Sequence, residues 1–258
     1  MPSVKLSQLL SAGTLLGNEI LAVVVPGSPN QSRKTTLAGI ATYLGKSATS
    51  STPAAAAITT PSIVQVGPIT GNTPNLVTLN TKPTPGNLIV VAAGCHDFRQ
   101  TVDGFARRAA YSVNDEAVAF YTKVATVDDT NQFTVSGWGD NGIMVAYELA
   151  GVDPFAIEQS NAISSGVNPG TSKGPKISPS RKNSVTIVIF GNSSGVSVQS
   201  MSAGFTLDAQ GLPANHGAAI ASGIFNGYAS YTPQATGALF GEDTVICALT
   251  FYAGPAGL

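Results

Sequence analysis

The sequence is short of charge, cysteine and histidine. Charged residues make up 10% of its 258 positions, the formal net charge is −1, and there are two cysteines and two histidines. A typical soluble domain carries about 25% charged residues. The chain therefore lacks the basic surface by which proteins attract nucleic acid or anionic membranes, and we expect neither as a partner.

Long apolar runs are also missing. No window reaches the roughly 18 consecutive apolar residues of a transmembrane helix, so we expect no membrane insertion. Near the start, the apolar residues are interrupted by Ser7, Gln8, Ser11 and Thr14. A secretory signal needs an unbroken apolar run of about 7–15 residues, and the pattern therefore disfavours a signal peptide.

The few cysteines and histidines restrict the chemistry that the chain can perform. Cys95 and Cys247 each fall in an apolar, strand-like run, which favours two buried thiols over a disulfide. Neither has metal-ligand spacing to a second Cys or His. His96 and His216 lie outside any Gly-x-Ser-x-Gly context. We therefore predict no metal, no cofactor and no enzymatic activity.

Glycine and proline are plentiful, with 28 and 16 copies, and Ser and Thr are abundant. This mixture is typical of many short strands joined by tight turns. After Gly45 no segment has a long helical period, and alternation in 117–124 puts Val118, Phe120 and Val124 on one face. The sequence therefore predicts a mainly β fold, with an antiparallel β-sandwich over 62–258. The expected strands are Ser62–Val66, Leu76–Asn80, Leu88–Ala93, Ala117–Ala125, Gln132–Gly137, Gly142–Leu149, Val185–Phe190, Val196–Ser200, Phe205–Ala209, Gly217–Phe225 and Val245–Tyr252, with a long loop over Asp153–Asn183.

Three segments of this region recur later in the chain. The segment 86–94 parallels 182–191, 119–126 parallels 219–226, and 142–151 parallels 243–254. Each half then consists of an apolar strand, variable loops, a repeat strand and a closing strand. We interpret the two halves as the two parts of one sandwich.

Residues 1–45 form a separate small unit in this interpretation. A hairpin of Ile20–Val25 and Ser32–Thr36 precedes a short helix with apolar residues at Leu37, Ile40 and Leu44. Such a unit is too small to bury a core, so its apolar face needs a partner. Residues 46–61, rich in Ser, Thr, Ala and Pro, are a linker to the sandwich.

The motifs of this unit support a family resemblance. They are Lys5-Leu-Ser-Gln-Leu9, Leu16-Gly-Asn-Glu19, Val23-Val-Val-Pro-Gly27 and Thr35-Thr-Leu-Ala-Gly-Ile40. In this order and spacing they resemble the N-terminal virion-anchoring segment of tailed-bacteriophage tail fibre and appendage proteins. Leu10 replaces the usual Pro, and Pro29 is an addition. The resemblance implies a virion protein, assembled in the host cytoplasm as a homotrimer, that binds other virion proteins. The attachment residues that we predict are Leu6, Leu9, Ile20, Val24, Leu37 and Ile40.

The sandwich carries a second resemblance. Gly86–Val91, Phe120–Ala125 and Val145–Asp153 are similar to the signatures of a β-sandwich module in phage and bacterial surface proteins. That module is described as jelly-roll or lectin-like. The resemblance implies a fold more than a function.

Aromatic residues beside Asn and Asp suggest a ligand for the sandwich. Ring faces stack on sugar C–H faces while polar groups bind the hydroxyls, so we expect recognition of a host-surface glycan. In the alternative, Trp138 caps the end of the sandwich and the tyrosines pack on a strand. The candidate glycan-binding residues are Trp138, Asp140, Asn141, Asn226, Tyr228 and Tyr231.

Two other functions stay open at this point. One is a capsid or tail decoration protein without receptor binding. The other is a glycan-hydrolysing tailspike, which needs two carboxylates about 5–9.5 Å apart. The carboxylates are expected in solvated turns. The candidates are Asp115–Glu116, Asp128–Asp129, Asp140 and Glu242–Asp243.

Overall fold

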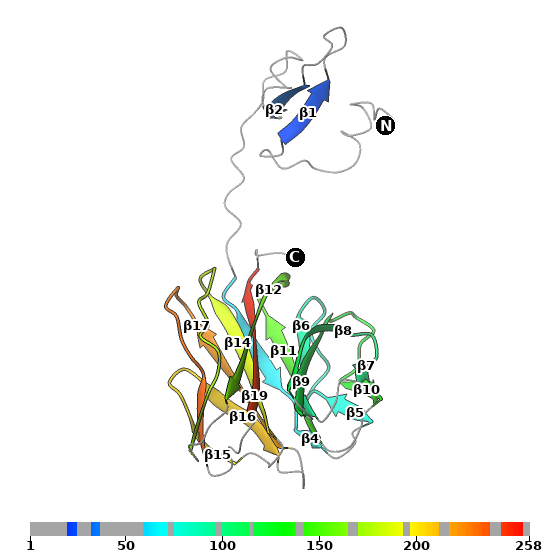
Figure 1. The fold of residues 1–258 in the computed structure, drawn as a ribbon. Helices are drawn as coiled ribbons and strands as arrows, with labels where there is room; N and C mark the ends of the chain where they lie inside the picture. Colours follow the sequence, from blue (N-terminus) through cyan, green and yellow to red (C-terminus); the bar gives the residue numbers. More distant parts are fainter. Residues whose placement is uncertain are drawn as a thin grey trace. The chain divides into compact units, whose positions relative to one another are not determined.

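The computed structural model divides into two compact units, Met1–Ala55 and Ala56–Leu258 (Figure 1). The structure describes 20–24 and 32–36 in the first unit and, in the second, 59–71, 75–95, 100–113, 116–137, 142–164, 170–192, 197–211, 217–237 and 244–254.

The described part of the first unit is a pair of strands. β1 (Ile20–Val24) pairs antiparallel with β2 (Ser32–Thr36), at the two positions where strands are expected. Ile20 and Val24 lie in β1. The expected helix that follows, the attachment residues Leu6, Leu9, Leu37 and Ile40, and linker residues 46–58 lie outside the described residues. The anchoring role of this unit stays a prediction.

The second unit is built on two large antiparallel sheets, each made from one contiguous half of the sequence (Figure 1). The first large sheet has the strand order β3-β11-β6-β9-β8, with β4 also paired to β11. Its strands are β3 (Ser62–Val66), β4 (Thr70–Gly71), β6 (Leu88–Cys95), β8 (Ala106–Val113), β9 (Glu116–Val124) and β11 (Gly142–Ala150). The second has the order β12-β19-β14-β17-β16. Its strands are β12 (Val152–Ser164), β14 (Ser184–Asn192), β16 (Thr206–Gly211), β17 (Gly217–Phe225) and β19 (Thr244–Ala253).

Each large sheet is covered on its outer side by a small three-stranded sheet. The first is β5-β10-β7 and the second is β13-β18-β15. Their strands are β5 (Leu76–Thr78), β7 (Thr101–Val102), β10 (Gln132–Ser136), β13 (Thr171–Lys173), β15 (Val198–Met201) and β18 (Gln234–Gly237). The described residues of this unit thus form four layers without a helix, and no membrane-spanning helix is found in this part of the chain.

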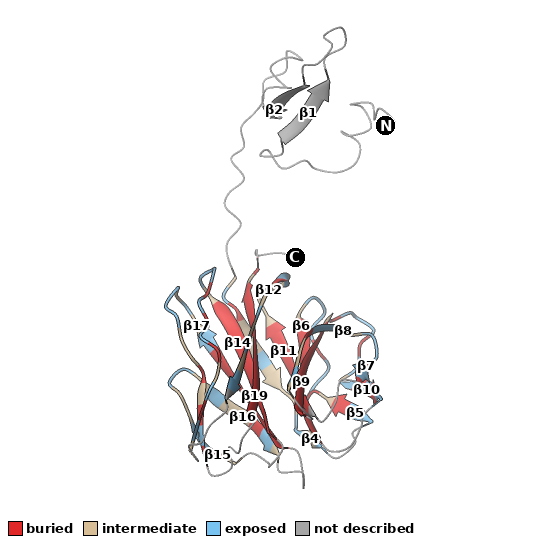
Figure 2. Cartoon of the chain, viewed as in Figure 1, coloured by how far each residue is buried: buried red, intermediate tan, exposed pale blue. Residues whose placement is uncertain are grey.

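Alternating side chains of the large sheets supply three cores. Val90, Val145 and Ile187 belong to the central core between the large sheets. Neighbouring residues of the same strands point outward, and Ile89 and Val188 pack against the two small sheets. Because both faces of β11, β14, β17 and β19 are covered, these strands are buried along nearly their whole length (Figure 2).

The sequence repeat corresponds to a structural one. Strand by strand, the order β3-β11-β6-β9-β8 matches β12-β19-β14-β17-β16, and the small sheets match in the same way. The register is also repeated, because Ala92 lies opposite Val145 and Phe120, just as Ile189 lies opposite Cys247 and Ile220. The prediction of two halves of one sandwich is confirmed.

A shift in strand register is also repeated in the two halves. The β8–β9 register shifts between Arg107 and Ala109, and the β16–β17 register shifts between Leu207 and Ala209. A bulge increases the local twist and leaves one residue unpaired. In the first half this residue is Arg108, whose Nε donates to the Thr122 hydroxyl at 2.9 Å. The two halves are therefore copies of one supersecondary plan.

The strand predictions are incomplete. Six strands of the second unit are not among them: β4, β7, β8, β12, β13 and β18. All eleven expected strands are present within a few residues of their predicted bounds. The expected loop Asp153–Asn183 is wrong, because it contains most of β12 and all of β13. β12 is an edge strand that pairs with β19 alone, and its segment Glu158–Asn161 is polar on both faces. Its strand conformation comes from backbone pairing to β19. The sequence of this segment therefore lacks the apolar alternation by which a strand is predicted.

Candidate functional site

The chain enters the sandwich where both of its halves end. The Thr59 hydroxyl lies 2.7 Å from the Gly151 carbonyl oxygen and 2.9 Å from that of Gly254. Gly151 follows the last strand of the first half and Gly254 follows the last strand of the second. We call this the tether end, defined by Thr59, Gly151 and Gly254.

The opposite end collects the other ends of the central strands. Cys95 at the end of β6 lies opposite Gly142 and Ala117, and Asn192 at the end of β14 lies opposite Gly217. The two groups belong to the same end, because a Cβ placed on Gly94 would lie 2.4 Å from that of Ala218. We call this the far end.

Three candidate glycan-binding residues follow β17 at the tether end. Tyr228 is 59% exposed, and the Lys182 ammonium lies 5.8 Å from its ring centre. Asn226 is also exposed. Tyr231 is half-buried, stacks on Phe225 with 3.8 Å between ring centres, and shares a 2.6 Å hydrogen bond with the Thr186 hydroxyl. Of the two tyrosines, Tyr228 is the more exposed.

The other three candidates, Trp138, Asp140 and Asn141, lie outside the described residues. The strand that follows them, β11, starts at the far end with Gly142. Ala218 and Phe225 are seven residues apart on one strand, which separates the far end from the end of β17 by roughly 23 Å. The two groups of candidates are therefore attached to strand ends on opposite sides of the sandwich.

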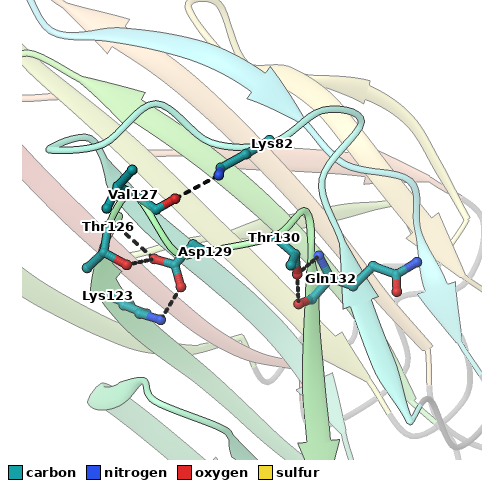
Figure 3. A network of polar contacts seen from close by, with 7 residues as sticks. All are labelled: Lys82, Lys123, Thr126, Val127, Asp129, Thr130 and Gln132. Atoms are coloured by element: carbon teal, nitrogen blue, oxygen red, sulfur yellow. Dashed lines mark hydrogen bonds and ion pairs between the residues drawn. The ribbon is translucent and has the colours of Figure 1, made fainter.

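Of the candidate acids Asp128 and Asp129, Asp129 is engaged in a turn (Figure 3). One Asp129 oxygen accepts from the Lys123 ammonium, and the other accepts from the Thr126 backbone N–H at 2.7 Å and from its hydroxyl. Burial works to raise the pKa of Asp129, but the hydrogen bonds from Lys123 and Thr126 outweigh it and hold the pKa below its usual value. Asp129 therefore stabilises the turn after β9.

Of the remaining polar candidates, Glu116 is buried in β9. His96, His216, Asp115, Asp140, Glu242 and Asp243 lie outside the described ranges. Within them, no group of three or more His, Cys, Asp or Glu residues is placed to hold a metal ion.

A cavity of about 290 Å³ opens on the outer side of the first large sheet. Its walls combine polar groups, a guanidinium among them, with aromatic rings. The lining residues are Gln100, Thr101, Val102, Phe105, Arg107 and Tyr121. No motif of the sequence points to these residues, although Arg107-Arg108 is a conspicuous pair in a chain with so few charges.

Two polar pairs, one part-buried and one buried, connect strands of the sandwich. The Tyr147 hydroxyl donates to the Asp208 carboxylate at 2.8 Å, which joins β11 of one large sheet to β16 of the other. Burial raises the pKa of Tyr147 well above its usual value, and the neighbouring Asp208 charge adds to this. Burial also raises the pKa of Asp208, against hydrogen bonds from Ser222 and Tyr147. The second pair is Asn192 and Thr244, in which the Asn192 amide donates to the Thr244 hydroxyl at 2.9 Å. Both pairs lie among packed side chains, which assigns them a structural role.

Cys247 is a free, fully buried thiol in the central core. Burial raises its pKa to about 12. It behaves as a small apolar residue, as the sequence predicts for it, and it is not joined to Cys95.

The fold places the second unit among all-antiparallel β-sandwich proteins with an internal duplication. Comparisons with protein-family models, with curated proteins and with solved structures find no match for the chain.

Proposed function

We propose that this chain is a structural component of a bacteriophage virion, a tail fibre or appendage that attaches by its N-terminus and displays its β-sandwich to host-surface glycans. The observation that carries the proposal is the ordered set of motifs between Lys5 and Ile40, which resembles a virion-anchoring segment. These motifs fall in a compact unit, Met1–Ala55, that is separate from the sandwich.

The positions of the two ends of the sandwich support the proposal that it is displayed to glycans. The chain enters at the tether end, and the strand that follows Trp138 begins at the far end. A ligand that binds at the far end meets the sandwich at the end opposite to Thr59. We include in the proposal a homotrimer, a location in the virion, a jelly-roll-like module and the lack of enzymatic activity.

Removing residues 1–45 is expected to abolish incorporation into particles while the sandwich stays folded. The physical reason is that the described sandwich has its own cores, whereas a hairpin-sized unit needs a partner to cover its apolar face. Quantitative mass spectrometry of purified particles measures the incorporation, and circular dichroism of the shortened protein measures its folding. Normal occupancy of particles by the folded, shortened chain would contradict the proposal.

Trp138→Ala is expected to reduce adsorption to host cells without lowering the melting temperature. Loss of one stacking ring removes about 1.4 kcal/mol if it is a binding hot spot, which is tenfold in affinity at each site. Adsorption assays on particles carrying each variant measure this, with Tyr228→Ala as the matched aromatic substitution at the tether end. A loss of adsorption with Tyr228→Ala alone would move the glycan contact to the tether end. A decoration protein without a receptor would show no loss with either variant.

A further inference from the structure

We infer that the cavity on the outer side of the first large sheet binds the carboxylate-bearing sugar unit of an acidic glycan. This inference rests on the proposed function and specifies the class of glycan. It concerns a place on the sandwich different from both groups of aromatic residues that the sequence suggested.

The cavity lies beside the strand pair β8–β9. Arg107 and Tyr121 are cross-strand neighbours on these strands, and both line it. The Tyr121 hydroxyl donates to the Gln100 carbonyl at 2.8 Å, which holds the start of β7 against the sheet. Because Gln100, Val102 and Tyr121 are at most 2% exposed, these walls of the cavity are already formed. A preformed site costs little conformational entropy on binding.

The lining chemistry matches an acidic sugar. Arg107 supplies an exposed guanidinium, whose planar fork suits a carboxylate, and the exposed Thr101 hydroxyl is a group that binds sugar hydroxyls. Phe105, which is half-buried, supplies the aromatic surface for C–H faces. Ligand pockets commonly have volumes of about 300–1,000 Å³, so a cavity of about 290 Å³ suits one small ring.

The duplication shows that this chemistry belongs to one half. The shared register sets Arg107 equivalent to Leu207 and Tyr121 equivalent to Ala221. In the second half these positions belong to an apolar cluster that also contains Phe205. The backbone plan therefore does not require an arginine or a tyrosine here. Tyr121 packs in the outer cluster of its half as Ala221 does in the other, and the difference in charge is at Arg107, where the second half has Leu207.

The test uses the full-length protein and saturation-transfer NMR with glucuronate, glucose and acetate as separate probes. Glucuronate is expected to bind, with glucose at least tenfold weaker because it lacks the charged hydrogen bond. Acetate is expected to be at least tenfold weaker because it has no ring to stack. Arg107→Leu is expected to weaken glucuronate binding at least tenfold, and the fold tolerates leucine at the equivalent position 207. Arg181→Gln, an exposed arginine of the second half, is the matched control and is expected to bind normally.

Several results would overturn the inference. Undiminished glucuronate binding by Arg107→Leu, or by Arg107→Gln should the leucine variant unfold, would exclude the cavity. Equal binding of glucose would exclude selection for the carboxylate, and equal binding of acetate would leave a simple anion site. A similar loss with Arg181→Gln would indicate nonspecific charge attraction. Any of these results would leave the anchoring experiment unaffected, so failure here is distinct from failure of the proposed function.

Discussion

Replacing Gly94 with alanine is expected to lower the free energy of unfolding of the sandwich by about 2 kcal/mol. An added Cβ would lie 2.4 Å from the Cβ of Ala218 on the facing sheet. The large sheets must separate locally to accept it, and both are held by small sheets behind them. Urea unfolding followed by tryptophan fluorescence or circular dichroism measures the effect.

The matched controls come from the same chain. Gly71→Ala adds a Cβ with only ordinary contacts, the nearest at 3.5 Å, and is expected to change the stability by less than about 0.5 kcal/mol. The double variant Gly94→Ala with Ala218→Gly moves one methyl group across the interface. It is expected to recover at least about 1 kcal/mol relative to additivity. Additive effects in this double-mutant cycle would show that Gly94 and Ala218 do not meet.

Replacing Glu148 with alanine is expected to lower the free energy of unfolding by about 3 kcal/mol. This carboxylate is 1% exposed. It accepts hydrogen bonds from Gln65 Nε2 and Asn87 Nδ2 at 2.6 Å each, and from the Thr84 backbone N–H at 2.8 Å. Its removal leaves these three donors without their acceptor, next to the edge strand β3. Chemical unfolding at pH 7 measures the loss, and Asp128→Ala, an exposed acid in a turn, is the control.

Glu148 is also expected to make the free energy of unfolding depend on pH. Burial works to raise the pKa of Glu148, but hydrogen bonds from Gln65, Thr84 and Asn87 outweigh it, so the folded pKa lies below the ordinary value of 4.5. A lowered folded pKa gives stability that is complete above the unfolded pKa and is lost as the pH falls through the folded pKa. Glu148→Gln should therefore lose less stability than the natural chain as the pH falls from about 5 to about 3. An equal loss in both proteins would contradict this assignment.

The duplication gives a physical account of how one half can change while the fold persists. The repeated register sets which side chains face the central core, and residues such as Val145 and Cys247 fill equivalent places with different volumes. The outer sides are less constrained, because each packs on its own small sheet. Arg107 and Leu207 are equivalent positions on these outer sides, and they differ in charge. We expect functional differences between the halves to lie on the outer sides.

The sequence by itself determined the internal repeat and eleven of the seventeen strands that the structure describes in the second unit. The boundary near residue 61 stays a prediction. The repeat and these strands follow from local patterns, since alternation and apolar runs report which residues of a strand are buried. The central strands were predictable for this reason. The apolar patterns of 86–94 and 182–191 suffice to match these two segments, and their strands β6 and β14 occupy equivalent places in the two large sheets.

The tertiary structure decided what depends on distant partners. Edge strands such as β12 take their conformation from backbone pairing, which leaves little trace in side-chain polarity. Glu148 looks like a surface acid in the sequence, yet Gln65, Thr84 and Asn87 converge on it from segments 61–83 residues away. The cavity beside Arg107 likewise needs β7, β8 and β9 to meet. Such sites arise from long-range packing, which local periodicity does not encode.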